Sequence, residues 1–271
     1  MLIKEQPLQH WIDNFYGYGS WDAKTWFISY EEGGGDLPED VAERLNYFHD
    51  VHPSGDGPTL CDIRDLYRRV SARIDGPRAN IFASLYDYRF GNNAILHGAW
   101  KNLITFQHAY NGKKIPDLLQ YQKSTFASPS KHNEALINFY PLPSPHNHAW
   151  YYSWLDMPEF SYLKSRASYQ DHVYKARITG ILKNIEKHKP AIVLMYGMSN
   201  INELRKSVQE IFPSAKFKMI GAIKQQIPQH HWTEFNGTTM LITTQVPTLR
   251  HNRVESGFDW EAFGKMIKPG R

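Results

Sequence analysis

Four short runs of apolar residues predict buried strands. They cover residues 25–29, 135–139, 191–196 and 239–243, and apolar side chains are nearly continuous within each run. A strand that is covered on both faces has this pattern, whereas a half-exposed strand alternates apolar and polar residues. Loops and helical patterns follow these runs, so we expect the four strands to run parallel in one sheet. Residues 216–221 are a further candidate strand.

Two helical patterns flank the third strand. Apolar residues at positions 178, 181, 182 and 185 have the spacing of a stripe that faces a sheet, and this helix ends at Lys189-Pro190. A second helix runs from about Asn200 to Phe212, because the residue before Pro213 disfavours helical backbone. Such alternation is typical of layered α/β proteins. The expected fold is a three-layer α/β/α domain with a central, mostly parallel four-stranded sheet.

The chain contains no internal repeat, low-complexity tract or interdomain linker. Two intervals, 36–80 and 141–161, are rich in Pro, Gly, Ser, His and aromatic residues, a composition typical of loops and short helices. We therefore expect a single domain over residues 1–271, with loop insertions around these two intervals.

Composition narrows the class of protein without identifying it. The 271 residues include 41% hydrophobic and 21% charged residues, as in folded globular proteins. A net charge of +4 permits a nucleic-acid partner but does not require one. The single cysteine, Cys61, excludes an internal disulfide and a Cys-ligated cluster, and we expect a buried or inert thiol. No segment approaches the roughly 18 apolar residues of a membrane span, which favours a cytoplasmic protein without membrane association.

Polar and glycine-containing segments stand at the ends of the four predicted strands. Open parallel sheets bind ligands beyond the carboxyl ends of their strands, so these segments are the first candidates for a site. Glycine there allows sharp turns and close approach of the backbone to a ligand. The segments are Tyr30 to Gly35, Asn138 with the following Tyr140-Pro141, Gly197 to Asn200, and Gln245 to Arg253.

Taken in this order, the four segments resemble the uracil-DNA glycosylase superfamily. The likeness consists of an acidic motif with glycine, a strand that carries a base-reading Asn, a VLMYG strand-to-helix turn similar to the family's VFLLWG, and a last strand entering a Pro-containing loop. It covers residues 26–267. The resemblance implies a DNA N-glycosylase that flips a nucleotide out of the helix and needs neither a metal nor a cofactor.

The resemblance assigns roles to residues at the first two strand ends. Glu32 matches the group that stabilises the sugar cation or positions the water, with Glu31 orienting it; alternatively, either residue caps a helix or is solvated. Asn138 matches the base-reading amide, with a strand Asn bonded to neighbouring backbone as the alternative, and Tyr30 joins it in the base pocket. Gly34 stands where strict uracil enzymes have a tyrosine that blocks carbon 5 of the pyrimidine, so this side is expected to be open.

The last loop departs most from the family. Val246-Pro247-Thr248 replaces the usual His-Pro-Ser, so the histidine that stabilises the leaving base is absent. His251 is the candidate replacement, with Arg250 as an alternative, unless the leaving group needs less help. Leu249, Arg250 and Arg253 are candidates for a wedge and phosphate contacts, although each arginine is equally consistent with a solvated surface charge.

Four clustered histidines, at positions 146, 148, 230 and 231, raise the question of a metal site. None has the HxxxH spacing with a nearby Glu that indicates zinc on a helix, so no metal is expected. Trp100 precedes the second strand and is expected in the core rather than in a stacking region.

These observations predict a monofunctional, monomeric DNA glycosylase. The extra loop length and the open side at Gly34 favour a bulky modified pyrimidine, such as glucosylated hydroxymethylcytosine of phage DNA, and hence an antiviral role through abasic sites. Three alternatives stay open: a uracil-DNA glycosylase in DNA repair, a catalytically silent nucleic-acid-binding module of the same fold, and a hydrolase of free nucleosides.

Overall fold

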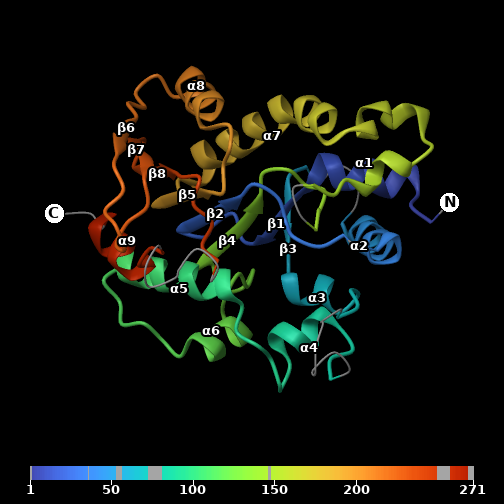
Figure 1. Ribbon diagram of the computed structural model, residues 1–271, viewed down its shortest axis with the longest axis horizontal. Coiled ribbons are helices and arrows are strands. Elements are labelled where there is room, and N and C mark those ends of the chain that lie inside the picture. Colours follow the sequence, from blue (N-terminus) through green and yellow to red (C-terminus); the bar gives the residue numbers. More distant parts are fainter. Residues whose placement is uncertain are drawn as a thin grey trace.

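The computed structural model describes residues 2–35, 37–52, 57–72, 81–145, 148–248 and 257–267. Within this part of the chain, the strands form one eight-stranded mixed sheet with the order β3-β1-β4-β2-β5-β8-β7-β6 (Figure 1). The strands are β1 (Phe15–Gly19), β2 (Thr25–Ser29), β3 (Thr59–Cys61), β4 (Glu134–Asn138), β5 (Ile192–Tyr196), β6 (Lys218–Ile220), β7 (His230–Phe235) and β8 (Thr238–Ile242).

The four strands expected from the apolar runs are β2, β4, β5 and β8. They are neighbours at the centre of the sheet, in the order β4-β2-β5-β8, and all three pairings between them are parallel. Phe27 of β2 stands in register with Leu136 of β4 and Leu194 of β5. The predicted parallel unit is therefore present, and the short strand predicted at 216–221 is β6.

The expectation of a four-stranded sheet is wrong. On one side β1 pairs antiparallel with β4 and parallel with β3, and on the other β7 and β6 continue the sheet antiparallel from β8. These strands lack a continuous apolar run: β1 reads FYGYG, β7 reads HHWTEF, and β3 and β6 are three residues long. Strands of this composition are not detected by looking for continuous apolar runs, the pattern of strands that are covered on both faces.

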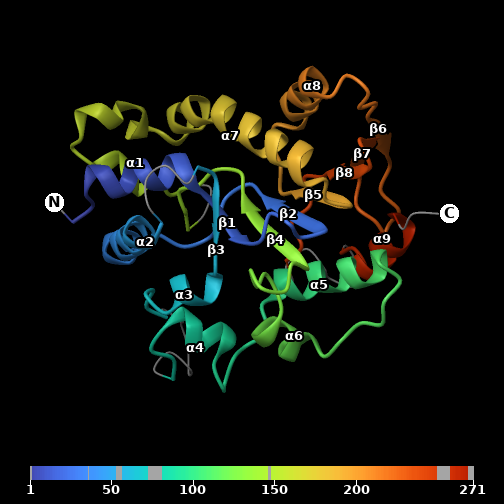
Figure 2. The same cartoon turned by 180° about the vertical axis from the view of Figure 1, so that it is seen from behind.

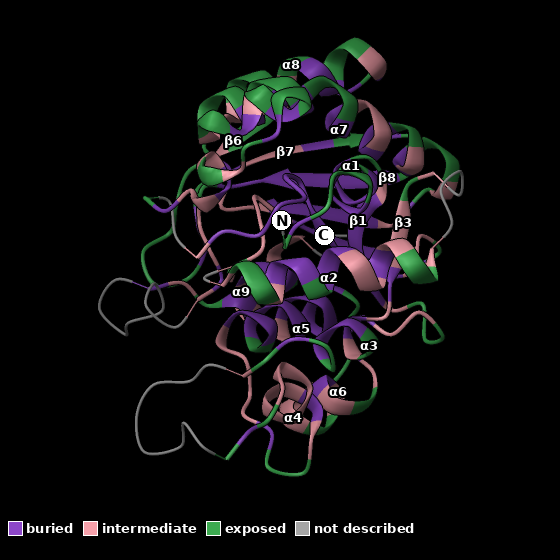
Figure 3. Cartoon of the chain, turned by 90° about the vertical axis from the view of Figure 1, so that its right-hand side faces the viewer, coloured by how far each residue is buried: buried purple, intermediate pink, exposed green. Residues whose placement is uncertain are grey.

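Helices cover both faces of the sheet (Figures 1 and 3). Consecutive residues of β2 point to opposite faces of the sheet and contact different helix layers. The ring centroid of Trp26 lies 6.3 Å from that of His188 in α7, and the ring centroid of Phe27 lies 6.3 Å from that of Phe106 in α5. Figure 2 shows the same arrangement from behind. The helices of these two layers are α7 (Arg166–His188) and α8 (Ile201–Ile211), and α5 (Gly98–Tyr110) and α9 (Trp260–Ile267).

Helix α7 carries the predicted apolar stripe and one unexpected charge. Ile178, Ile181, Leu182 and Ile185 are buried, and the helix ends where Lys189 adopts a left-handed φ of 48° before Pro190. Arg177 lies on the same buried face. Its guanidinium donates to the carbonyl oxygens of Phe15, Asn138 and Phe139 at 2.9, 2.6 and 2.9 Å. This arginine thereby holds the carboxyl end of β4 against the N-terminal strand.

The interval 36–80 contains α2 (Pro38–Val51), β3 and α3 (Ile63–Tyr67), and the interval 141–161 contains the 3₁₀ helix η1 (Tyr151–Trp154). Helix α2 buries Val41, Leu45 and Phe48 in the core, and Phe48 packs edge-on against Trp11. Part of the first interval is therefore core structure. The remaining helices are α1 (Glu5–Asn14), α4 (Leu85–Phe90), α6 (Leu118–Ser124) and η2 (Pro158–Lys164).

No helix among the described residues combines the length and the apolar character that crossing a membrane requires.

Candidate functional site

A cavity of about 460 Å³ opens at the carboxyl ends of the central strands. Ser29 ends β2, Asn138 ends β4, Tyr196 ends β5, and Val246 follows β8; all four line the cavity. Parallel strands bring their carboxyl ends to one edge of a sheet, which explains why residues more than two hundred positions apart meet here. The sheet topology thus places a cavity at the strand ends, where a site is expected from the sequence.

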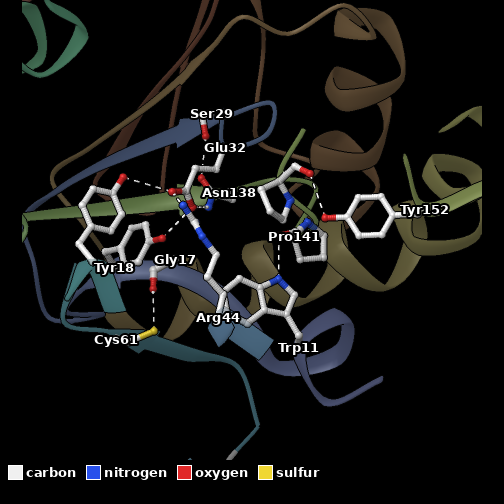
Figure 4. Close-up of polar contacts among 12 residues, drawn as sticks. Trp11, Gly17, Tyr18, Ser29, Glu32, Arg44, Cys61, Asn138, Pro141 and Tyr152 are labelled. Atoms are coloured by element: carbon white, nitrogen blue, oxygen red, sulfur yellow. Dashed lines mark hydrogen bonds and ion pairs between the residues drawn. The ribbon is translucent and has the colours of Figure 1, made fainter. Parts of the chain in front are cut away.

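Glu32 lies at the centre of a hydrogen-bond network in this cavity (Figure 4). Its Oε2 accepts from the Tyr18 hydroxyl at 2.7 Å and from Asn138 Nδ2 at 3.4 Å. Its Oε1 accepts from Arg44 Nη1 at 2.9 Å and from the Tyr67 hydroxyl at 3.2 Å. An ionised carboxylate has about four acceptor positions, so these four donors occupy all of them.

The donors around Glu32 are buried and keep their protons. Burial alone would lower the pKa of Arg44, but the Glu32 carboxylate outweighs this effect and raises it above its usual value. Burial, and then the Glu32 charge, raise the pKa of both Tyr18 and Tyr67. Arg44, only 2% exposed, therefore stays positive, and the two phenols stay neutral donors. The arrangement surrounds the Glu32 carboxyl group with a preorganised cage of four donors.

Gly34 lines the cavity beside Arg44, and its backbone conformation favours glycine. Its φ is 114°, a conformation that side chains with a Cβ rarely adopt, and a Cβ placed there would lie 3.6 Å from Arg44 Nη2. Gly34 therefore has a conformational reason to be glycine in addition to the open pocket side expected from the resemblance.

Glu31 faces a different set of residues from Glu32. Its Oε1 pairs with Nη1 of Arg166, at the start of α7, at 2.5 Å. Arg166 also donates to the Ser144 hydroxyl and to the Ala149 carbonyl. Burial raises the pKa of Glu31, and the charge of Arg166 offsets part of this effect. The two adjacent carboxylates are thus oriented by separate cationic partners.

Asn138 contacts side chains rather than its own backbone neighbours. Besides donating to Glu32, it accepts from the Ser29 hydroxyl through Oδ1 at 2.9 Å. The residue is 5% exposed and lines the cavity. An amide has two hydrogens and two acceptor positions, so one of each remains available to a ligand. Asn138 can therefore offer a donor and an acceptor to the edge of a base.

Three aromatic side chains, here called the aromatic wall, form another part of the cavity lining: Tyr67, His97 and Trp100. Trp100 stacks on His97 and Phe90, with ring centroids 4.6 and 5.7 Å apart, and lies 6.3 Å from Tyr67. Burial, with a smaller effect of Arg89, lowers the pKa of His97 to about 3, so this imidazole is neutral at pH 7. Trp100 is buried, as expected, and it also lines the cavity.

A second cavity of about 370 Å³ adjoins the first. Ser29, Glu31, Tyr196 and Val246 line both. Tyr30 lies in the second cavity, with its ring 4.9 Å from that of Tyr140. Tyr30 and Asn138, expected together in one base pocket, therefore line neighbouring cavities. The other residues around the second cavity are Arg166, Gln170, Gly197 and Ser199.

The segment after β8 is only partly described. Val246 lines both cavities, and the carbonyl of Pro247 accepts from Asn102 Nδ2 at 2.9 Å, which ties the segment to α5. The predicted leaving-group residue and DNA contacts, namely Leu249, Arg250, His251 and Arg253, lie outside the described residues.

His230 and Cys61 have local hydrogen-bond partners. His230 on β7 is buried and bonds the Pro228 carbonyl through Nδ1 at 2.8 Å. Among the described residues, no group of three or more His, Cys, Asp or Glu side chains is arranged to hold a metal ion. Cys61 donates to the Gly17 carbonyl at 3.6 Å, and burial raises the pKa of its thiol (Figure 4). Such a thiol is a poor nucleophile.

Tyr18, Arg44, Tyr67 and His97 are the site residues that the sequence did not indicate. The sequence position of Arg44 could have indicated its role. It lies three residues after Val41 and next to Leu45 on the apolar face of α2, where a charged side chain needs a buried partner. Tyr18 lies in the Tyr-Gly-Tyr-Gly segment. A Cβ on Gly17 would lie 2.0 Å from the Leu136 carbonyl, so this glycine serves the close contact of β1 with β4.

Comparisons with protein-family models, curated proteins and solved structures find no match for this chain. We therefore assign a function from the geometry of the two cavities.

Proposed function

We propose that this protein is a DNA N-glycosylase of the uracil-DNA glycosylase type. The observation that carries the proposal is the direct contact of Glu32 with Asn138, at 3.4 Å, in an open cavity at the carboxyl ends of parallel strands. These are the two residues that the resemblance assigns to catalysis and to base reading. The proposal includes DNA as the partner, a monomer and a cytoplasmic location.

In this proposal Glu32 acts through its charge. Cleavage of the bond between C1′ and the base nitrogen leaves positive charge on the sugar, and a preorganised anion stabilises that charge. The four donors around Glu32 leave no acceptor position for a water proton, so the geometry favours electrostatic stabilisation over general-base catalysis. The base departs with the bonding electrons, the water oxygen forms the new bond to C1′, and the proton that this water loses passes through solvent to the anionic base.

The remaining surfaces suit recognition of an extruded base. Asn138 has one donor and one acceptor available, and the aromatic wall of Tyr67 and Trp100 provides flat surfaces against which a base can pack. The cavity volume of about 460 Å³ lies within the range of about 300–1,000 Å³ that is usual for small-molecule sites.

We favour a bulky modified pyrimidine over uracil as the base. The first cavity has glycines at 33–35 on one side, and a second cavity of about 370 Å³ extends it. A substituent on carbon 5 would have room beyond the base. Glucosylated hydroxymethylcytosine of phage DNA is the example we propose, with an antiviral role through abasic sites; uracil in DNA repair is the alternative substrate.

The test is base release from defined DNA. Duplexes that carry uracil, hydroxymethylcytosine or glucosylated hydroxymethylcytosine are incubated with the full chain, and abasic sites are scored by alkaline cleavage. We expect release of the glucosylated base and a roughly 100-fold or greater loss of rate in Glu32→Gln. Glu210→Gln, an exposed carboxylate on α8, is the matched control. Full activity of Glu32→Gln would remove the assigned role, and strong activity on uracil alone would overturn the bulky-base proposal.

One observation favours a second candidate, a nucleic-acid-binding module without catalysis. The positive charge of Arg44 lies 2.9 Å from Glu32 and reduces the field that this carboxylate exerts on a sugar cation. DNA binding without release of any of the three bases would support this candidate.

A further inference from the structure

The second cavity has features that a base alone does not explain. It begins at Glu31 and Tyr196, which it shares with the first cavity, and extends to Gln170 on α7 and Ser199 before α8. The two cavities adjoin, because four lining residues belong to both. A ligand whose base contacts Asn138 in the first cavity can therefore extend a substituent into the second.

Two buried polar atoms around this cavity have no hydrogen-bond partner among the described residues. They are Glu31 Oε2, an acceptor, and Gln170 Nε2, a donor. The Glu31 side chain is only 10% exposed, and its Oε1 pairs with Arg166. Both atoms are shielded from water, but they belong to residues that line the cavity, so a small side-chain rotation would turn each toward a ligand. An unsatisfied buried polar group is costly, and a ligand that supplies the missing hydrogen bonds would remove that cost.

We propose that the second cavity binds the hexose of a hexosylated pyrimidine, with Glu31 and Gln170 bonding its hydroxyl groups while the base occupies the first cavity. This inference rests on the proposed function and names the substrate class of the same site. The Ser199 hydroxyl offers a further polar contact, and the rings of Tyr30 and Tyr196 offer flat apolar surfaces to the C–H face of a sugar.

The chemistry of the cavity favours hydroxyl groups over a phosphate. Glu31 Oε2 needs a donor, and an ionised phosphate has only acceptors. The guanidinium of Arg166 already contacts Glu31, Ser144 and Ala149. The positive charge beside this cavity therefore interacts with groups of the protein rather than with a bound phosphate. A hydroxyl both donates and accepts, and neighbouring hydroxyls of one sugar can therefore satisfy Glu31 and Gln170 together.

The experiment compares two substrates that differ only in the sugar. Matched oligonucleotides carry either hydroxymethylcytosine or glucosylated hydroxymethylcytosine, and both base release and equilibrium binding are measured with the full chain. We expect the wild type to prefer the glucosylated oligonucleotide. Gln170→Leu should reduce that preference roughly tenfold, the effect of losing one buried hydrogen bond, and leave action on hydroxymethylcytosine within about twofold.

Two further variants keep the result interpretable. Ser199→Ala changes an exposed residue at the same cavity and should reduce the preference in the same direction, even if Gln170→Leu folds poorly. Gln120→Leu changes an exposed glutamine on α6 and should leave the preference unchanged. Equal losses on both oligonucleotides, or an unchanged preference in both cavity variants, would overturn the hexose site.

The two proposals fail in distinguishable ways. Base release that does not depend on the sugar would preserve the glycosylase proposal and overturn the hexose site. Absence of base release from every DNA, together with a binding preference for the glucosylated oligonucleotide that Gln170→Leu abolishes, would overturn the glycosylase and preserve the hexose site. Absence of both base release and sugar-dependent binding would overturn both.

Discussion

At the scale of single residues, the centre of the site is a buried ion pair with a polar cage. Arg44 and Glu32 are both largely shielded from water, at 3% and 12% side-chain exposure, and each compensates the charge of the other. Tyr18 and Tyr67 complete the cage from β1 and α3. Such a pair is sensitive to the loss of one member, because the remaining charge stays buried without a partner.

The first prediction concerns Arg44→Met. Removal of the guanidinium leaves the Glu32 carboxylate uncompensated, and we expect the free energy of unfolding to fall by about 3–5 kcal/mol in urea titrations. The double variant Arg44→Met with Glu32→Gln should recover part of this loss. Arg68→Met removes an exposed ion pair with Asp65 and should change stability by less than about 1 kcal/mol. An equally large loss in Arg68→Met would contradict the special role of the buried pair.

The second prediction separates two roles of Gly34. If the positive φ of 114° is the main requirement, Gly34→Ala should lower stability by about 1–3 kcal/mol. Gly33→Ala is a close control, because no atom lies within 4 Å of a Cβ there and no positive φ is involved. Both variants are compared by thermal unfolding. Unchanged stability of Gly34→Ala would leave the open pocket side as the sole explanation for this glycine.

At the scale of elements, β4 links the core to the site from both of its ends. Asn138 at its carboxyl end lines the cavity, and Glu134 at its first position is fully buried. Glu134 accepts from the Tyr121 hydroxyl on α6 at 2.5 Å and from the Ala127 amide at 3.4 Å. Burial raises its pKa to about 7, although these hydrogen bonds act in the opposite direction.

The third prediction follows from this shifted pKa. Because the folded-state pKa of Glu134 lies above its unfolded value of 4.5, its contribution to stability is complete below pH 4.5 and is lost as the pH rises through 7. Between pH 5 and 8, the wild type should lose about 2–3 kcal/mol relative to Glu134→Gln, which cannot ionise. Glu234→Gln, at an exposed position of β7, is the matched control for the replacement of a carboxylate by an amide. Parallel pH profiles for the wild type and Glu134→Gln would refute this assignment.

The elements also show which features of the fold a sequence reveals. The central strands and α7 were predictable, because burial on both faces demands continuous apolar residues and burial on one helical face demands a stripe. The outer strands were not predictable. Strand β1 contains Gly17 and Gly19, which allow its close contact with β4, and strand β7 contains several polar residues instead of a continuous apolar run. Glu32 lies shortly after β2 and Asn138 ends β4, so the strand-end rule marks both as candidate residues. Arg44, Tyr67 and His97 come from helices or loops whose position only the tertiary structure defines.

At the scale of the whole molecule, one continuous hydrophobic core extends across the sheet. Buried side chains reach from Cys61 on edge strand β3 to Phe235 on β7, with the rings of α1 and α9 included. A continuous core of this kind favours cooperative unfolding of the elements that contribute to it. The helices on the two faces of the sheet should therefore unfold together, with one common free energy of unfolding.

The fourth prediction tests that unity. Leu8→Ala in α1 and Leu204→Ala in α8 remove fully buried side chains at distant places in the core, and each should cost about 2–5 kcal/mol. Both should shift the same single transition when it is followed by tryptophan fluorescence and by far-UV circular dichroism. Two separate transitions, each moved by only one of the substitutions, would indicate independent folding units.

The cage around Glu32 also has a consequence for the detection of distant relatives. Its four donors come from β1, α2, α3 and β4, and no two of them are neighbours in the chain. A linear motif cannot describe such a site, but a five-point spatial template can: two phenol oxygens, a guanidinium and an amide around one carboxylate. A protein of unrelated sequence that presents this template at the carboxyl ends of parallel strands would be a candidate for the same chemistry.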